Sequence, residues 1–445
     1  MWFARRVGGW AFPPTSKGEE MITKSNEIYE RAIKVIPGAT QTLSKGADRF
    51  VNGVSPKFLS HGHNAHVWDV DGNEYIDLPM GLGAILLGHS IKEVSNRIWW
   101  AADDGTAFTL PHYSEVDLAE KLVDIIPCAE LVRFCKNGSD ATEGAVRIAR
   151  AVTGRKHIAH CGYHGSHDWS AVTGGLLRGL IDDGYVHKFE YNNPQSLVKV
   201  LYDFPCAAVI MEQPLEEPMV VSEEGGINYL QFVSECAHAY GSLFILDEIV
   251  TGFRYALGGA SEFYNVTPDL ACYGKAMANG LPISAIVGKR EYMQTLTEGV
   301  FFSNTFSGET TAIAAALKTI EIVQRENVID KLWRLGGYLR TWIEVKAHEA
   351  GLKINLRGNA VRSVLEIPDK DGNNDLLAYS LFLQETHKRG VLFGIPIFPC
   401  WTHTEEDMKK VAEAVGVAFK KIKEADGDYM KYLEGDPIPP PIIRA

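Results

Sequence analysis

The sequence predicts an α/β fold in which helices cover both faces of a mostly parallel sheet. Two predicted strands, residues 207–211 and 242–247, are continuously apolar, the second between Ser242 and Asp247, as strands are when both faces of a parallel sheet are buried. Residues 228–241, which lie between them, carry apolar side chains at helical spacing. A strand, a helix and a second strand in this order indicate a parallel βαβ unit.

The two ends of the chain carry the elements of a smaller α+β unit. Helical spacing over residues 25–36 stops at a Pro-Gly pair, and two β-rich runs joined by Asp71-Gly72 predict a hairpin over residues 66–78. Near the other end, residues 404–407 resemble a helix capping box. The helix predicted behind this box has one apolar stripe, formed by Met408, Val411, Val415, Phe419 and Ile422.

We therefore expect a large domain flanked by a small domain that is built from both chain ends. Residues 21–80 should form the N-terminal segment of the small domain, residues 81–325 the large domain, and residues 326–445 the C-terminal part of the small domain. Residues 1–20 have no periodic apolar face. We expect them to be a disordered extension without a role in the fold.

Length and composition limit the functions that the chain can have. It has 445 residues, of which 46% are hydrophobic, and a formal net charge of -12. The hydrophobic content is ample for a large core. Lysines and arginines are scattered singly or in adjacent pairs, and no longer basic run is present, so the sequence does not indicate the basic face of a nucleic-acid-binding protein. No apolar run reaches the roughly 18 residues of a membrane span. From these two observations we expect neither a nucleic-acid nor a membrane partner.

Cysteine usage predicts a cytoplasmic protein. The chain has seven cysteines, an odd number, at irregular spacing and without a CxxC pair. This usage is typical of reduced, mostly buried thiols rather than of a disulfide framework.

The predicted strand over residues 242–247 ends in two acids, Asp247 and Glu248. Ligands of open α/β sheets bind beyond the carboxyl ends of the strands. A carboxylate at this place can hold a cationic ring nitrogen. The alternative is that Asp247 only caps the helix that follows.

Lys275 lies among small, mostly uncharged residues, including Gly274, Ala276 and Gly280. A lysine in such a segment either reaches the surface or is held away from water. Desolvation lowers the pKa of an amine, which suits it to form a Schiff base. The sequence around Lys275 leaves both alternatives open.

Asn137, Gly138 and Ser139 form a turn before a predicted helix. The free N–H groups at a helix start, together with a glycine and a hydroxyl, can hold a phosphate. The alternative is an ordinary N-cap. Tyr163, in the loop GYHGSHDW, can stack on a flat ring or can be an ordinary loop aromatic.

The histidines of the chain do not predict a metal site. His164 and His167 form one pair, and His61, His63 and His66 form a second group. Neither group has the accompanying Cys or carboxylate spacing of a zinc site. We expect no metal.

The order and spacing of these pieces closely resemble the class III aminotransferases of pyridoxal-5′-phosphate (PLP) fold type I. The motifs that carry the resemblance are LDEIVTGFRYALGGASEFYNVTPDLACYGKAMANGLP, HVWDVDGNEYID and HTEEDM. Within the family they are most similar to the glutamate-1-semialdehyde 2,1-aminomutases. The resemblance covers roughly residues 25–425 and implies a large domain with a mixed, mostly parallel sheet.

The resemblance implies catalytic roles for three residues. Lys275 would bind PLP covalently and move the substrate proton, and Asp247 would keep the pyridine nitrogen protonated so that the ring absorbs carbanion charge. Tyr163 would press on one face of the ring, and Ile249 on the other.

The resemblance also implies the remaining contacts. Gly138 and Ser139 would hold the phosphate, and His164 would lie at the cofactor. Thr305 matches a threonine that reaches the cofactor phosphate of the neighbouring subunit, which implies a homodimer. Glu212 falls near a glutamate of the family and is a candidate substrate contact.

Positions that face the substrate depart from the aminomutase pattern. Lys45 stands where the aminomutases have an arginine for the substrate carboxylate, Leu82 replaces a tryptophan, and residues 395–401 lack an acid. We therefore expect an aminotransferase that moves an amino group between an amino donor and an aldehyde or ketone by a ping-pong mechanism. The aminomutase remains the alternative. A catalytically silent relative is disfavoured by the intact Lys275 and Asp247.

Overall fold

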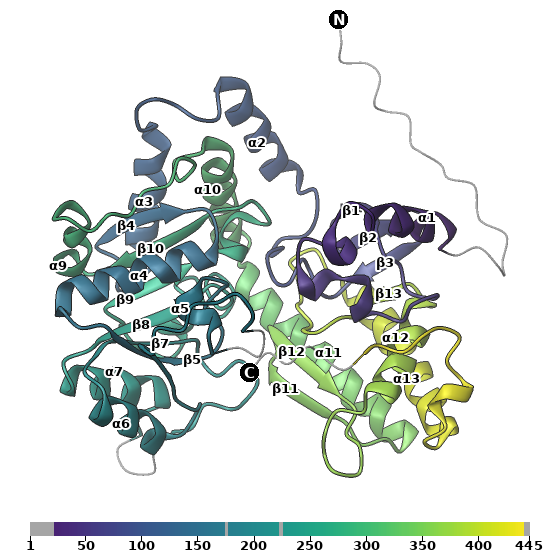
Figure 1. Cartoon of the computed structure of the whole chain (residues 1–445). Coiled ribbons are helices and arrows are strands. Elements are labelled where there is room, and N and C mark those ends of the chain that lie inside the picture. The colour runs from purple at the N-terminus through teal and green to yellow at the C-terminus, as the bar shows by residue number, and fades with distance from the viewer. Residues whose placement is uncertain (1–21, 174–176, 222–225, 440–445) are drawn as a thin grey trace, which may run out of the picture.

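A computed structural model describes residues 22–173, 177–221 and 226–439. Its main element is a seven-stranded sheet with the strand order β4-β10-β9-β8-β7-β5-β6 (Figure 1). Strand β10 runs antiparallel to both of its neighbours, and the other strand pairs are parallel. The strands are β4 Leu131–Cys135, β5 His157–Cys161, β6 Val186–Lys188, β7 Cys206–Met211, β8 Leu243–Glu248, β9 Leu270–Tyr273 and β10 Ser284–Gly288. The α/β prediction is confirmed.

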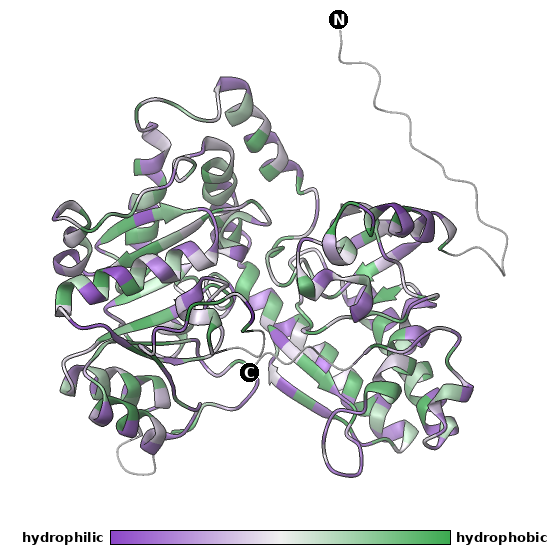
Figure 2. Cartoon of the chain, in the orientation of Figure 1, coloured by the Kyte–Doolittle hydropathy of each residue, from purple (hydrophilic) through white to green (hydrophobic). Residues whose placement is uncertain are grey.

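The two strands predicted from continuous apolar runs, β7 and β8, are buried along their whole length and pair in parallel. Alternate residues of β7 face opposite layers. Ala208 and Ile210 pack in the core beneath α4 (Gly138–Thr153), whereas Val209 and Met211 pack in the core beneath α6 (Pro194–Asp203) and α7 (Tyr229–Ala239). Figure 2 shows the strands of this sheet as mostly hydrophobic. Burial on both faces is therefore the reason that the runs do not alternate.

Helices cover both faces of the large sheet and extend beyond its β4 edge (Figure 1). The predicted helix between β7 and β8 is α7, and the side chain of Asn228 caps it by accepting a hydrogen bond from the amide of Gln231. The α-helices of this part, α7 included, are α2 Lys92–Asp104, α3 Tyr113–Ile125, α4 Gly138–Thr153, α5 Asp168–Ala171, α6 Pro194–Asp203, α7 Tyr229–Ala239, α8 Ala260–Phe263, α9 Arg290–Met293 and α10 Thr310–Arg325.

A second, smaller sheet joins the two ends of the chain. Its strand order is β1-β2-β3-β13, and β13 lies parallel to β3. The predicted hairpin is confirmed as the antiparallel pair β2 and β3. A separate two-stranded hairpin, β11 and β12, lies beside the C-terminal helices (Figure 1). The elements are β1 Leu59–His63, β2 His66–Asp69, β3 Glu74–Asp77, α11 Val328–Ala350, β11 Asn355–Asn359, β12 Arg362–Glu366, α12 Leu376–His387, β13 Val391–Leu392 and α13 Glu405–Ala425.

The prediction for the start of helix α13 is confirmed, whereas the end of helix α1 differs from its prediction. Helix α1, Thr23–Ala32, is shorter than predicted, because Pro37 restricts Ile36 to an extended conformation and the residues before it form turns. The capping box of α13 is confirmed: Thr404 accepts a hydrogen bond from the amide of Asp407 and returns one to its carboxylate. The predicted apolar stripe of α13 is buried.

Three further sequence predictions can be placed on this fold. All seven cysteines are free and buried, as predicted. Among the described residues, no helix combines the length and the apolar character that crossing a membrane requires. The domain boundaries at residues 80 and 325 remain predictions, and residues 1–20 lie outside the described part of the chain.

Candidate active site

The two acids at the carboxyl end of β8 have different partners. Asp247 is 3% exposed, and its Oδ2 accepts a hydrogen bond of 2.8 Å from His164 Nδ1. Glu248 instead accepts from the amides of Ala260 and Ser261, at 2.8 and 2.7 Å, at the start of α8. Glu248 therefore does the helix capping that was the alternative role for Asp247, and Asp247 is left facing the site.

His164 lies buried behind Asp247 and fixes its orientation. The Nε2 atom of His164 is 3.1 Å from the carbonyl oxygen of Cys161, and its own carbonyl accepts a hydrogen bond of 2.6 Å from Thr142 Oγ1. Because a carboxylate only accepts, Nδ1 of His164 is the donor to Asp247. His164 thus connects Asp247 to β5 and α4.

Lys275 is the first residue of a 3-10 helix, Lys275–Ala278, that follows β9, and its backbone conformation is unusual. Its φ is 42°, in the left-handed region that non-glycine residues rarely adopt, and such strain is common where the surrounding structure serves function. Lys275 is only partly exposed. Burial lowers the pKa of its amine, and the carboxylates of Glu212 and Asp247 oppose this effect. The surface-lysine alternative is thereby disfavoured.

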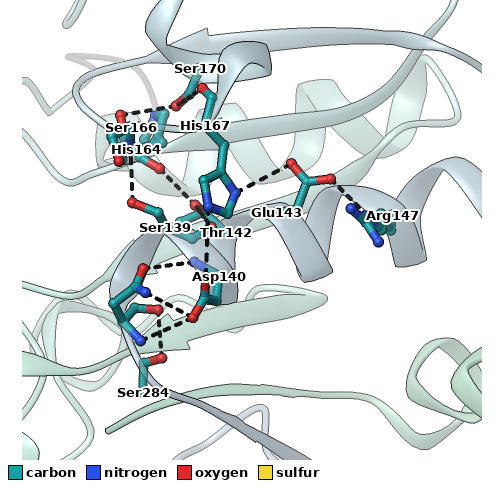
Figure 3. Close-up of polar contacts among 12 residues, drawn as sticks. Ser139, Asp140, Thr142, Glu143, Arg147, His164, Ser166, His167, Ser170 and Ser284 are labelled. Carbon is teal, nitrogen blue, oxygen red and sulfur yellow. Dashed lines mark hydrogen bonds and ion pairs between the residues drawn. The ribbon is translucent and has the colours of Figure 1, made fainter. Parts of the chain in front are cut away.

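Figure 3 shows the polar contacts at the start of α4, including the hydrogen bond between Ser166 and Ser139. Asn137 is the cap: its side chain accepts a hydrogen bond of 3.2 Å from the amide of Asp140. Gly138 and Ser139 are the first residues of the helix, where N–H groups have no intrahelical partner. Ser139 Oγ accepts a hydrogen bond of 3.0 Å from the amide of Ser166, so its own proton can be donated outward.

Ile249 brings the turn and Lys275 together. A Cβ atom placed on Gly138 would lie 3.1 Å from Ile249 Cδ1, and one placed on Gly274 would lie at the same distance from that atom. Both glycines therefore allow the Ile249 side chain to approach closely. The helix start, the end of β8 and the residue before Lys275 converge on this side chain.

Tyr163 and Glu212 are joined by a hydrogen bond, and Glu212 lies close enough to Asp247 and Lys275 to interact with their charges. Tyr163 is 58% exposed, and its amide donates a hydrogen bond of 3.1 Å to Glu212 Oε2. Glu212 is 9% exposed, and burial, followed by the charge of Asp247, raises its pKa. A Cβ atom on Gly162 would lie 2.5 Å from the hydroxyl of Tyr191 and 2.9 Å from Glu212, so this loop closes tightly over the glutamate.

Two predicted site residues lie elsewhere in the described chain. Lys45 is exposed in a 3-10 turn, Leu43–Lys45, and none of the described contacts connects it to Asp247 or Lys275. Thr305 is also exposed and lines a pocket of about 390 Å³. The walls of that pocket are formed by residues 107–112, 302–305 and 307–309 together with Glu115, Arg133 and Phe134.

Sequence reasoning assigned no role to Arg254, although it lies within the motif TGFR. Its side chain is fully buried, donates to the carbonyl oxygens of Pro399 and Gly83 at 3.2 and 3.1 Å, and stacks on Phe398 at 4.7 Å. Burial lowers its pKa to about 10. Arg254 thus holds together two loops in which substitutions were noted. Arg362, a single arginine without a recognisable motif, was also missed.

Comparison with known proteins gives consistent matches over most of the chain. Residues 51–178 and 183–419 match the family described as Aminotransferase class-III. The chain is 35% identical to 3-aminobutyryl-CoA aminotransferase from Cloacimonas acidaminovorans, over 90% of this chain and 98% of that protein. It is 31% identical to glutamate-1-semialdehyde 2,1-aminomutase from Methanosphaera stadtmanae, over 90% and 99%.

A solved structure supports the same grouping. The PLP internal aldimine form of the Sphingopyxis sp. MTA144 FumI protein superimposes with a TM-score of 0.83, at 28% identity, covering 91% of this chain and 97% of that one. This similarity confirms the predicted fold type I.

Proposed function

Because this chain belongs to the class III aminotransferases, which are PLP enzymes, we propose that it transfers an amino group from an amino donor to an aldehyde or ketone by a ping-pong mechanism. The observation that carries the proposal is the convergence of Asp247, Lys275 and the Gly138-Ser139 turn on Ile249. The rest of the proposal concerns what each of these residues does.

The residues present fit the cofactor. The start of α4 and the Ser139 hydroxyl offer donors for a phosphate, and Ile249 with its flanking glycines offers a flat apolar surface for a ring. The buried carboxylate of Asp247 suits a protonated ring nitrogen, and His164 holds it in place. Lys275 is the amine for the aldehyde. When bound, PLP supplies an electron sink for the charge that develops on the substrate α-carbon.

Proton transfer falls to Lys275. Burial lowers the pKa of this amine, so a larger share of it is uncharged near neutral pH and can accept a proton at Nζ. We infer that Nζ, once the amino donor has displaced it from the cofactor, would take the proton from the carbon that bears the donor's amino group and would deliver it to the C4′ carbon of the cofactor. Tyr163 would cover that part of the ring opposite Ile249. The first product would leave before the carbonyl acceptor binds, as a ping-pong order requires.

We further propose that the enzyme is a cytoplasmic homodimer in which Thr305 completes the neighbouring subunit's phosphate site. Thr305 is exposed, and exposed apolar side chains flank its pocket: Leu110 is 76%, Phe301 79% and Phe306 57% exposed. An apolar surface of this kind favours burial against a second copy. The seven free thiols support a reducing compartment.

The aminomutase is the second candidate, because relatives with that name are 31% identical over 90% of the chain. It is less favoured here because Lys45 is exposed and outside the group around Lys275. A panel of amino donors and carbonyl acceptors, including 3-aminobutyryl-CoA as a donor, would test the proposal through the visible absorbance of the bound cofactor. We expect turnover to require a separate acceptor. Formation of 5-aminolevulinate from glutamate-1-semialdehyde without an acceptor, with a specificity constant of about 10⁴ M⁻¹s⁻¹ or more, would establish the aminomutase instead.

A further inference from the structure

Arg362 lies on the β11–β12 hairpin, near the group of residues around Lys275. It is the first residue of β12 and lies opposite Asn359 in the hairpin register. The hairpin rests on the loop after β7, since the amide of Gly358 donates a hydrogen bond of 3.0 Å to the carbonyl of Glu216. A Cβ atom on Gly358 would lie 2.8 Å from the Leu215 carbonyl oxygen, so this close contact depends on glycine.

The guanidinium of Arg362 is only partly engaged. It donates to the carbonyl oxygen of Leu215 at 3.2 Å and to Glu216 Oε1 at 3.1 Å. An arginine has more N–H donors than these two contacts use. Arg362 itself is 9% exposed, whereas the side chain of Glu216 is 42% exposed. A shielded, permanent positive charge is thus paired with a carboxylate that water can still reach.

The location of Arg362 relative to the site follows from the loop it binds. Leu215 lies just after Glu212 on the loop that leaves β7, and Glu212 holds the amide of Tyr163. Arg362 also acts electrostatically on the site. Its positive charge adds to the effect of burial in lowering the pKa of Lys275.

The other two candidate cations do not offer an open anion site. Lys45 lies exposed in its 3-10 turn. Arg254 is fully buried and holds two carbonyl oxygens and an aromatic ring. Arg362 combines shielding from water with unused donors and a replaceable partner. Planar guanidinium groups bind carboxylates and phosphates with two parallel hydrogen bonds.

We propose that Arg362 binds an anionic group of the substrate, a carboxylate or a phosphate ester, in place of the Glu216 carboxylate. The inference rests on the proposed aminotransferase function and adds a substrate class to it. Glu216 neutralises the arginine while no substrate is bound. A substrate anion then displaces it and orients the amino group toward Lys275.

The test is a calorimetric titration of the PLP-loaded enzyme with glutarate and with glycerol 3-phosphate, neither of which carries an amino group to transfer. We expect one of them to bind the wild type, and the preferred probe distinguishes a carboxylate from a phosphate ester. Arg362→Gln should weaken that binding about 30-fold, which corresponds to the loss of a charge-assisted hydrogen bond. Arg362→Lys, which keeps the charge without the planar fork, should bind with intermediate affinity.

Two matched variants sharpen the result. Arg357 lies on the same hairpin and pairs with Glu366, so Arg357→Gln should leave the affinity unchanged. Glu216→Gln removes the competing carboxylate and should tighten binding. The proposal is overturned if the wild type binds neither probe, or if Arg362→Gln binds as tightly as the wild type. Absence of amino transfer with every donor would instead overturn the proposed function, because the titration does not depend on turnover.

Discussion

Replacing Asp247 with asparagine should show how much of the reaction rate depends on the negative charge of this side chain rather than on its shape. The two side chains have nearly the same size, so the substitution removes the charge while the position is retained. Asp247 is 3% exposed and is held by His164 at 2.8 Å. The charges in question are the Asp247 carboxylate and the protonated ring nitrogen of the cofactor. At such a shielded place, opposite charges about 4 Å apart attract by about 4 kcal/mol at an effective dielectric constant of about 20. Losing that attraction in the transition state corresponds to a rate loss of about 10³-fold.

The assay is the single-turnover reaction of the PLP-loaded enzyme with an excess of amino donor, followed by the visible absorbance of the cofactor. Asp269 provides a matched control. It is fully buried and accepts from His238 at 2.7 Å, but it lies at the amino end of β9, on the far edge of the sheet. Asp269→Asn should lower stability and leave the rate per folded enzyme within about threefold of the wild type, a difference below 1 kcal/mol.

The result that would refute this reasoning is a loss of less than about tenfold in Asp247→Asn, which is about 1.4 kcal/mol. An equal loss in Asp269→Asn would also refute it, since the effect would then belong to any buried aspartate in the sheet.

The remaining predictions concern Lys275 and Thr305. Lys275→Ala should abolish turnover but still retain some PLP through phosphate and ring contacts, as measured by bound cofactor after gel filtration; turnover at the wild-type rate would refute the assignment. Because burial lowers the pKa of Lys275, the rate should rise with pH as the amine loses its proton and should level off below about 10.4, the ordinary lysine value; a pH–rate profile that keeps rising beyond that value would contradict this. Inactive Lys275→Ala subunits mixed and refolded with Thr305→Ala subunits should regain activity, because one site of each mixed dimer then has both residues; no gain over the separate variants would show that Thr305 does not act across the interface.

The fold was predictable, and the residues proposed to face the cofactor could be named, because their signals in the sequence are local. The apolar runs of β7 and β8 reflect burial on both faces, which any two-sided sheet imposes on its own residues. Asn137 stands at the start of helix α4, and the two acids stand at the end of strand β8, so each is located by one element alone. The sequence did not decide between Asp247 and Glu248 as the helix cap, because that choice depends on where α8 begins in space.

The residues proposed for the substrate could not be found in this way. Arg362 meets Leu215 and Glu216, which are far away in the sequence, only because a hairpin in the C-terminal part packs on the loop after β7. No periodicity or motif around Arg362 records that contact. Lys45 was a candidate substrate contact because it stands where the aminomutases have an arginine; it is exposed in its 3-10 turn, and its role at the substrate stays a prediction.

This difference has a physical origin. The groups around Lys275 come from the ends of strands and the start of one helix within the large sheet, where the spacing along the chain fixes the spacing in space. The candidate anion site is formed between the loop after β7 and a hairpin outside the large sheet, so the side chains of Arg362 and Glu216 can change without disturbing the seven-stranded sheet. Such a chain can keep its cofactor chemistry while the substrate-binding arginine moves to a different element. Resemblance in sequence then predicts the reaction class, and the contacts of Arg362 are needed to predict the substrate.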